Sequence, residues 1–427
     1  MTEDSERGRS DADVDASGIL SRRSFLGAAA LAVGGGLGYV AGDLRGDGER
    51  SPVPAENAEA ISFFGDHQAG IGTPAPEFLN FAAFDLVSGS ADDLRGLLRE
   101  WASVASTVSL GRSYRVKAER AGAPPSDPGE AVGLGPAALT VTFGFGPGLF
   151  SRGGVDGLGS RWPAALAALP PFKGDSLDPT RSGGDLCVQV CADDPQAAFH
   201  AIHVMARIAI GVASLRWVQH GFGPTAGEGG QTPRNLMGFK DGTNNVRGDD
   251  AEAMDEHVWV QPGDGPEWME GGTYMVVRRI KMLLDVWDET SLGGQERVIG
   301  REKQSGAPLG GREEHDEVDL DAREEGQPVI PSDAHVRLSS PESNGGARLL
   351  RRGYSFSEPP EPGSGQLEVG LFFICFQRDP RRQFVPIQRR LAASDALNRH
   401  ILHTGSAVFA CPPGVEPGGF VGEGLFA

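Results

Sequence analysis

The order of strand-like and helix-like segments in the first half of the chain constrains its fold more than any other feature. The strand-like segments are 78–86, 138–150, 185–194 and 213–223, and the helix-like segments are 90–105 and 195–210. Ser90 and Pro195 stand at positions where helices commonly begin. The order strand–helix–strand–strand–helix–strand predicts a ferredoxin-like module of split βαβ type.

The second half of the chain repeats this pattern without close sequence identity. A strand leading into a helix at 271–289 is followed by an apolar strand, a helix and a last strand; these lie at 365–380, 383–401 and 403–413. The 62 glycines and 30 prolines indicate many turns rather than a helical bundle. We therefore predict an α+β fold of two ferredoxin-like modules with antiparallel sheets, at residues 58–230 and 231–427.

Residues 1–57 have the pattern of an export signal followed by a disordered linker. Arg22 and Arg23 precede Phe25, and the sixteen residues from Leu26 to Ala41 carry no charge. This arrangement is typical of a twin-arginine signal; the alternative is an ordinary secretory signal with a chance arginine pair. We expect export by the twin-arginine machinery to the periplasm, the cell envelope or the medium, and no stable membrane span in the mature protein. Proteins on this route cross the membrane folded, often with a cofactor already bound.

Charge and cysteine content exclude some other classes of protein. A formal net charge of −19 argues against a nucleic-acid-binding surface, which needs a basic face. Cys187 and Cys191 would lie about 13 Å apart along a strand, too far for a disulfide. With Cys375 and Cys411 they are interpreted as buried apolar residues, and no zinc site is expected.

Three parts of the sequence are open to both a structural and a functional interpretation. His200 and His203 lie three residues apart on a predicted helix, but no acidic or cysteine ligand is near in sequence, so a structural role is favoured. The charged segment 295–328 is interpreted, for most of its length, as a solvated surface loop. Asp241, in "GFKDGTNN", is either a turn residue or a reactive carboxylate.

His335 is the third histidine of interest, in the alternating segment "DAHVRL". Arg351 and Arg352 follow sixteen residues later, and a strand-like return could place an arginine and the histidine on the two sides of a planar cofactor. A lone histidine is more often structural, so the residues by themselves leave both roles open.

The segment "GFKDGTNN" resembles the Gly-x-x-Asp-Gly signature of the dye-decolourising peroxidases, which are haem enzymes of two ferredoxin-like modules. The blocks "FFGDHQAGIGTP", "NFAAFDL", "LTVTFGFGPGLF", "GGTYMVVRRIKM" and "LNRHILHTGSAVFACPPG" also resemble that family, in the same order, from about residue 61 to the end. Together with the twin-arginine pattern, the resemblance suggests the exported branch, which includes peroxidases linked to bacterial iron uptake.

The resemblance implies a role for each of several residues. His335 matches the haem-iron ligand, and Asp395 matches the carboxylate that hydrogen-bonds its other ring nitrogen. Asp241 and Arg351 match the catalytic pair on the other face of the haem, with Arg352 as the alternative arginine. Cofactor contacts are also expected from Gly242 and Thr243, where the backbone would pass close to the porphyrin.

The function implied is that of an exported haem b peroxidase, with haem bound in the C-terminal module. Hydrogen peroxide would form a ferryl intermediate that oxidises dyes or other small organic or phenolic donors. The alternatives are a deferrochelatase-like protein that releases iron from haem, a non-catalytic haem-binding protein, and a secreted binding module without haem. Bulky donors would need surface Tyr or Trp residues as relays, and none is assigned; a homo-oligomer is possible.

Overall fold

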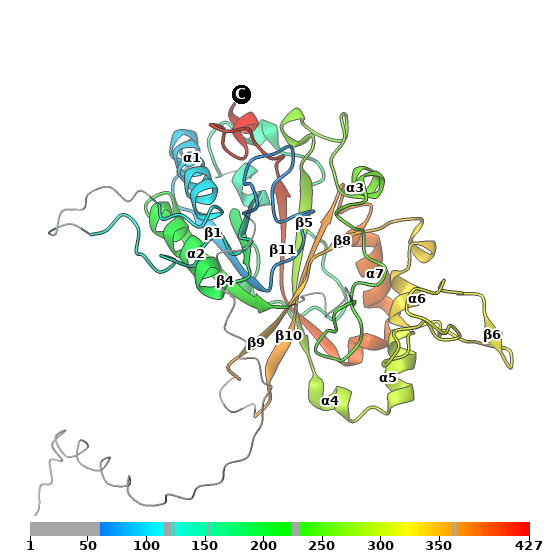
Figure 1. The fold of residues 1–427 in the computed structure, drawn as a ribbon. Helices are drawn as coiled ribbons and strands as arrows, with labels where there is room; N and C mark the ends of the chain where they lie inside the picture. The colour runs from blue at the N-terminus through cyan, green and yellow to red at the C-terminus, as the bar shows by residue number, and fades with distance from the viewer. Residues whose placement is uncertain are drawn as a thin grey trace, which may run out of the picture. The chain divides into compact units, whose positions relative to one another are not determined.

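The framework of the protein is one nine-stranded antiparallel sheet that closes on itself, and its two halves, one in each predicted module, are here called the first and the second sheet (Figure 1). The structure is a computed structural model that describes residues 60–114, 122, 124–151, 154–223, 231–360, 363 and 365–427. The export signal and linker predicted at 1–57 lie outside the described residues. All the described residues belong to one compact unit, which contains the described parts of both predicted modules.

The first sheet has the strand order β2-β3-β1-β4, as expected for a ferredoxin-like module. Its elements are β1 (Phe78–Leu86), α1 (Ala91–Val108), β2 (Thr140–Phe145), β3 (Leu186–Ala192), α2 (Pro195–Ala209) and β4 (Ala213–Phe222). The Ser90 side chain accepts a hydrogen bond from the Asp93 amide and thereby begins α1, as predicted. Asp194 caps α2, whose first residue is Pro195.

The second sheet repeats this topology with the order β9-β10-β5-β11, and the two-residue strand β8 also pairs with β10. Its strands are β5 (Thr273–Met282), β8 (Leu350–Arg351), β9 (Tyr354–Glu358), β10 (Glu368–Gln377) and β11 (Ile401–Cys411). The connections contain α3 (Ala251–His257), α4 (Leu284–Asp288), α5 (Leu292–Ile299), the hairpin β6 (Arg323–Glu324) and β7 (Gln327–Pro328), α6 (His335–Ser339) and α7 (Phe384–Ser394). The predicted α+β class with antiparallel sheets is confirmed, since the described strands pair antiparallel within each sheet.

The two sheets join edge to edge and enclose a shared apolar core. One residue pair, Ala410 with Phe145, links β11 to β2, and the pair Phe222 with Ser355 links β4 to β9. Phe81 packs inside against Phe372 of the other sheet at a ring-centroid distance of 5.3 Å. The four cysteines are free and buried, as predicted.

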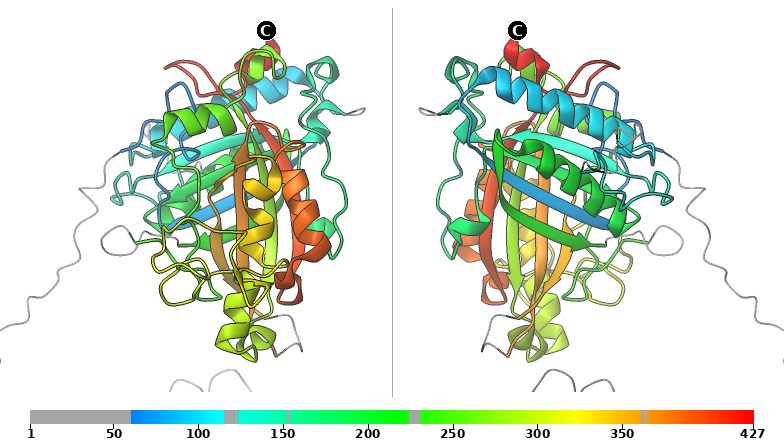
Figure 2. Two further views of the ribbon diagram at one scale, coloured as in Figure 1. Left: turned by 90° about the vertical axis from the view of Figure 1, so that its right-hand side faces the viewer. Right: turned by 90° about the vertical axis from the view of Figure 1, so that its left-hand side faces the viewer.

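Helices cover the outer face of each sheet, and the side chains of β5 alternate between the two layers. Figure 2 shows α1 and α2 on one side and α6 and α7 on the other. Met275 and Val277 of β5 belong to the inner core, whereas Arg278, Ile280 and Met282 face a cavity under the C-terminal helices. The second sheet therefore supports the site. None of the helices that the structure describes is long and apolar enough to span a membrane.

Candidate active site

A cavity of about 520 Å³ lies between the second sheet, the helices α6 and α7, and the loop at residues 235–244. Its apolar lining residues include Ile280, Met282, Leu371, Phe373, Ile387, Leu391 and Ile401. Asp241, Gly242, Thr243, His335, Arg351 and Asp395, all predicted from the sequence, also line it. Asp241 and Asp395, which are 154 positions apart in the chain, thus meet at one cavity.

Residues 232–245, here called the Asp241 loop, present the aspartate through a closed turn. The Asn235 side-chain oxygen accepts hydrogen bonds from the amides of Met237 and Phe239, at 3.0 and 3.3 Å. The Asp241 amide donates to the Pro233 carbonyl at 2.8 Å. Gly238 has φ +85°, which explains a glycine there, and an added Cβ would lie 2.7 Å from the Lys303 side chain. Asp241 therefore belongs to a turn and also lines the cavity.

Arg351 binds Asp241 directly. Its Nη1 donates to Asp241 Oδ1 at 2.6 Å, across 110 residues of sequence. The Asn245 side chain fixes the arginine backbone, since its Oδ1 accepts from the Arg351 amide and its Nδ2 donates to the Arg351 carbonyl, both at 2.8 Å. Arg352 points elsewhere: it is buried and donates to the carbonyls of Thr73 and Pro74. Of these two adjacent arginines, Arg351 is therefore the one that lines the cavity.

His335 and Asp395 form the second pair at the cavity. The imidazole Nδ1 lies 2.6 Å from Asp395 Oδ2, while Asp395 Oδ1 accepts from the Leu397 amide. Burial disfavours the charged imidazole, but Asp395 outweighs this effect, and the pKa of His335 is raised above its ordinary value. With Nδ1 engaged, Nε2 is the nitrogen available to a ligand.

The backbone around His335 differs from the alternating, strand-like segment expected from the sequence. Residues His335–Ser339 form the short helix α6, and the Leu338 amide bonds to the Ala334 carbonyl. Ala334 and Leu338, four residues apart, are both buried, so the spacing that decided the conformation was helical. Five residues are too few for alternation to distinguish the two.

Gly242 and Thr243 line the cavity, and each has a further role in the loop itself. Gly242 has φ +135°, and a Cβ added there would lie 3.5 Å from Thr232, an ordinary contact. Backbone conformation therefore requires the glycine. The Thr243 hydroxyl donates to Glu314 Oε1 at 2.9 Å and thus holds the loop.

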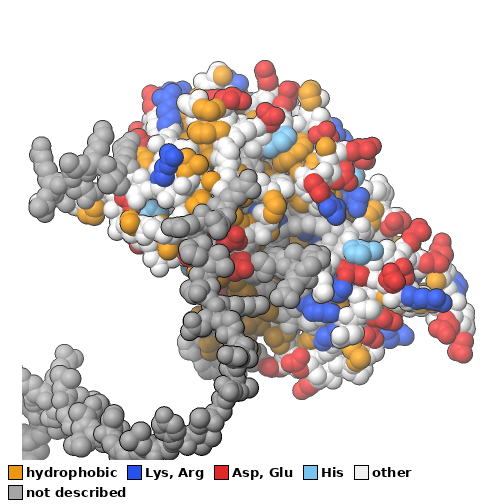
Figure 3. Space-filling model, viewed as in Figure 1, with side chains coloured by type: hydrophobic (Ala, Val, Ile, Leu, Met, Phe, Trp, Pro, Cys, Tyr) orange, Lys and Arg blue, Asp and Glu red, His pale blue; other side chains and the backbone are white. Residues whose placement is uncertain are grey.

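The segment 295–328, interpreted as a solvated loop for most of its length, is not solvated in its first part, where Gln295, Arg301 and Ala307 are buried. Arg301 is buried, and its Nη1 donates to the carbonyls of Gly306 and Glu314. The Glu314 side chain is only 11% exposed and pairs with Lys240 of the Asp241 loop. Acidic side chains do gather at the surface over the β6 hairpin (Figure 3). Composition could not separate Glu314 from its exposed neighbours, because its partners lie more than 70 residues away.

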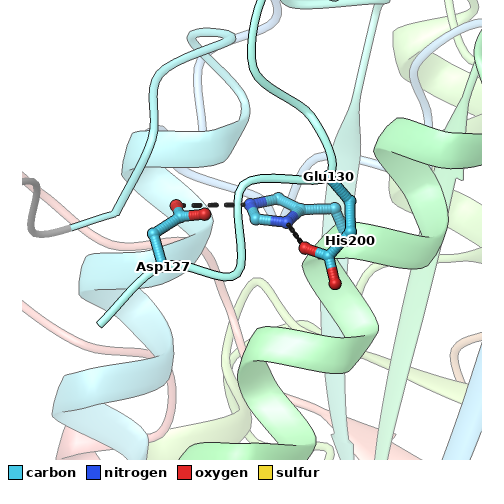
Figure 4. Close-up of side chains that lie close together, drawn as sticks. All are labelled: Asp127, Glu130 and His200. Carbon is cyan, nitrogen blue, oxygen red and sulfur yellow. Dashed lines mark hydrogen bonds and ion pairs between the residues drawn. The ribbon is translucent and has the colours of Figure 1, made fainter. Parts of the chain in front are cut away.

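The two histidines of α2 contact acidic residues that sequence distance had hidden. Glu130 accepts from Nδ1 of both His200 and His203, at 2.7 and 2.6 Å. Asp127 lies 3.5 Å from Nε2 of His200, on the opposite edge of the ring (Figure 4). One ligand atom from each of Asp127, Glu130 and His200 lies within 4.8 Å of the other two, so acidic groups at metal-ligand spacing do accompany this histidine. In the structure the contacts of both carboxylates with the histidines fasten the 124–130 segment to the helix.

Two family models match the chain, and together they cover most of it. The model "Dyp-type peroxidase, N-terminal" matches residues 68–223, and "Dyp-type peroxidase, C-terminal" matches residues 232–416. A dye-decolorizing peroxidase of Thermobifida fusca is 40% identical over 95% of this chain and 97% of its own length. A deferrochelatase of Escherichia coli K12 is 36% identical over 93% of this chain and 94% of its own.

Solved structures of the same class have the same fold. Ferric DtpA from Streptomyces lividans has a TM-score of 0.81 at 40% identity, covering 88% of this chain and all of that one. A DyP-type peroxidase from Cellulomonas bogoriensis has a TM-score of 0.79 at 43% identity, covering 87% and 99%. The fold, the cavity and these likenesses define a peroxidase of two ferredoxin-like modules. The chain belongs to the Dyp-type peroxidase family, as its sequence motifs predicted.

Proposed function

We propose that this protein is an exported haem b peroxidase that uses hydrogen peroxide to oxidise small organic donors. The observation that carries the proposal is that two pairs, His335–Asp395 and Asp241–Arg351, line one cavity. A carrier would need only the first pair. The second supplies an acid–base group and a fixed cation, which catalysis requires.

The residues at the cavity fit haem. Its volume lies within the roughly 300–1,000 Å³ range of cofactor pockets, and much of its lining is apolar. The Nε2 of His335 is a neutral-imidazole donor of the kind that binds haem iron.

His335 would hold the iron, and Asp395 would hold His335. By accepting the Nδ1 proton in a 2.6 Å hydrogen bond, the carboxylate fixes the tautomer in which Nε2 carries a lone pair. It also increases the basicity of the ligand. Asp395 is itself held by the Leu397 amide, so the orientation of the imidazole is over-determined.

Asp241 and Arg351 would act on peroxide. Haem, when bound, supplies the redox chemistry of O–O cleavage; these residues supply the proton transfer and the charge. The hydrogen bond from Arg351 goes to Oδ1 of Asp241, so we expect Oδ2 to take the proton from one peroxide oxygen and return it to the other. The permanently charged guanidinium stabilises the negative charge that develops on oxygen.

A second function, release of iron from haem with the porphyrin left intact, is favoured by the likeness to deferrochelatases over nearly the whole chain. Both functions use the same cavity. The experiment that separates them starts from protein reconstituted with haem. Donor oxidation after peroxide addition supports the peroxidase, whereas free protoporphyrin with negligible donor turnover supports iron release. A protein that shows no Soret band after reconstitution contradicts both.

Export rests on Arg22, Arg23 and the uncharged span that follows them. Replacing both arginines by lysine should trap the precursor in the cytoplasm, because the pathway requires the arginine pair while lysine keeps the charge. Cell fractionation with immunoblotting measures this. Unchanged export of the double variant would point to an ordinary secretory signal.

A further inference from the structure

The residues on both sides of Asp241 are held by one carboxylate. Lys240 Nζ donates to Glu314 Oε2, and Thr243 Oγ1 donates to Glu314 Oε1 at 2.9 Å. The two carboxylate oxygens of Glu314 therefore hold residues of the loop on both sides of Asp241. Thr232, at the start of the Asp241 loop, is a further hydrogen-bond partner of the same carboxylate.

Glu314 is itself fixed from behind. Arg301, buried beneath it, donates from Nη1 to the Glu314 carbonyl at 2.9 Å and to the Gly306 carbonyl at 2.7 Å. Gly306 has φ +81°, and a Cβ there would lie 2.6 Å from Cδ of Lys240 and 3.4 Å from Cγ of Glu314. The lysine stem and the glutamate are thus packed against a rigid turn.

The charge of Glu314 also has a partner next to the reactive group. Lys240 immediately precedes Asp241, so its ammonium would be the nearest cation to compete with Arg351 if it were released. Burial opposes ionisation of Glu314, but hydrogen bonds from Lys240, Thr232 and Thr243 outweigh it and lower the pKa of the carboxyl to about 2. The Glu314 carboxylate is therefore ionised even in moderately acidic solution.

We propose that Glu314 is a positioning residue for the peroxide reaction: it immobilises the Asp241 loop and keeps the Lys240 ammonium away from the Asp241 carboxylate. This inference rests on the proposed function for its kinetic consequence, but not for its structural one. The charged or titratable groups around Asp241 are Lys240 on its own loop, Arg351 on β8, Glu314 and Arg301 on the 300–314 segment, and His335 on α6.

The first arm of the test needs no haem. In the protein without cofactor, hydrogen exchange of the peptide covering residues 239–246 is compared between the unsubstituted chain and Glu314→Gln. We expect about 10-fold faster exchange in the variant, because an amide cannot accept both hydrogen bonds with the strength of a carboxylate. Glu313→Gln removes the same charge from an exposed neighbour and should leave the exchange unchanged.

The second arm measures the pH dependence of the reaction of the haem-loaded protein with peroxide. Glu314→Gln frees a cation beside Asp241, which favours the ionised carboxylate, so the acidic limb of the profile should move to lower pH, with a rate loss of about 10-fold. Lys240→Met leaves an unpaired anion and should move the limb to higher pH. Glu314→Gln combined with Lys240→Met should restore the original position.

Opposite shifts in the two single variants, with faster exchange in Glu314→Gln, support the proposal; a purely structural role would not move the limb in opposite directions. Unchanged exchange in Glu314→Gln, or rate losses without any shift of the profile, would overturn it. If the unsubstituted protein fails to bind haem or to react with peroxide, the proposed function fails, while the exchange experiment still decides whether Glu314 holds the loop.

Discussion

Single hydrogen bonds decide which residues at this cavity can do chemistry. Arg351 and Arg352 are adjacent in sequence and identical in type, yet one donates to Asp241 and the other to the Thr73 and Pro74 carbonyls. The sequence motif therefore pointed to the pair Arg351-Arg352. Because neighbouring side chains in extended backbone point to opposite sides, only Arg351 faces Asp241. The roles that the resemblance implied for the site residues remain predictions that substitution can test.

Arg351→Leu tests the charge at the cavity. We expect peroxide cleavage to slow by about 10²–10³-fold with haem still bound, because a preorganised cation is lost at the developing oxygen charge. Stopped-flow absorbance of the Soret band measures the rate. Arg352→Leu is the matched control: it should lower stability but leave the rate per bound haem unchanged. Equal losses in the two variants would remove the special role of Arg351.

Asp395→Asn tests the carboxylate behind His335. The amide keeps the size of the side chain but not its charge, so haem affinity or activity should fall by about 10–100-fold. Titration of the apoprotein with haem gives the affinity, and potentiometry should show a higher iron reduction potential as the imidazole becomes a weaker donor. An unaltered potential would show that Asp395 only packs against the ring.

At the scale of elements, short connections rather than the regular strands assemble the site. Asn245 joins the Asp241 loop to β8 by two hydrogen bonds across 106 residues. The glycines of the sequence predicted a turn at residues 238–242, and in the structure Gly238 and Gly242 do adopt backbone conformations that favour glycine. It could not show which distant strand the turn meets, because that depends on packing.

Asn245→Ala should destabilise the protein by about 1–3 kcal/mol, since it leaves the amide and the carbonyl of Arg351 without these partners. Chemical denaturation followed by circular dichroism measures the change. Asn244→Ala, which removes only an exposed contact with Arg348 at 3.2 Å, should cost less than about 0.5 kcal/mol. A similar loss in both variants would mean that the pair of hydrogen bonds with Arg351 is not special.

At the largest scale, a network of ion pairs and hydrogen bonds joins the two sheets. Arg279 of β5 is buried and binds Glu358 of β9 at 3.1 Å and Glu368 of β10 at 2.9 Å. Gln219 of β4, in the first sheet, donates to Glu358 at 2.8 Å. The network therefore crosses from one predicted module to the other.

This network should make stability depend on pH. Burial raises the pKa of Glu358, but hydrogen bonds and charge from Arg181, Arg279 and Gln219 outweigh it, so its pKa is lowered from 4.5. The stabilisation that ionised Glu358 gives the folded state is therefore fully present above its unfolded pKa near 4.5. This stabilisation is lost as the pH falls from there through the lower pKa of the folded state. Glu358→Gln should cost about 2–4 kcal/mol at pH 7 and progressively less below pH 4.5. Thermal unfolding across pH 3–7 measures this, and a constant difference would exclude the carboxylate as the cause.

Local periodicity, helix caps, glycines and short motifs act over a few residues, and they were enough to predict the succession of strands and helices, the two-module pattern, the family and the residue types available for chemistry. Long-range packing selects Arg351 rather than Arg352 as the partner of Asp241. It also brings Glu314 to Lys240 and Thr243, and it places one apolar core between the two sheets. These contacts join residues 70 to more than 100 positions apart, and the free energy that selects them comes from packing and burial, which composition and spacing do not encode.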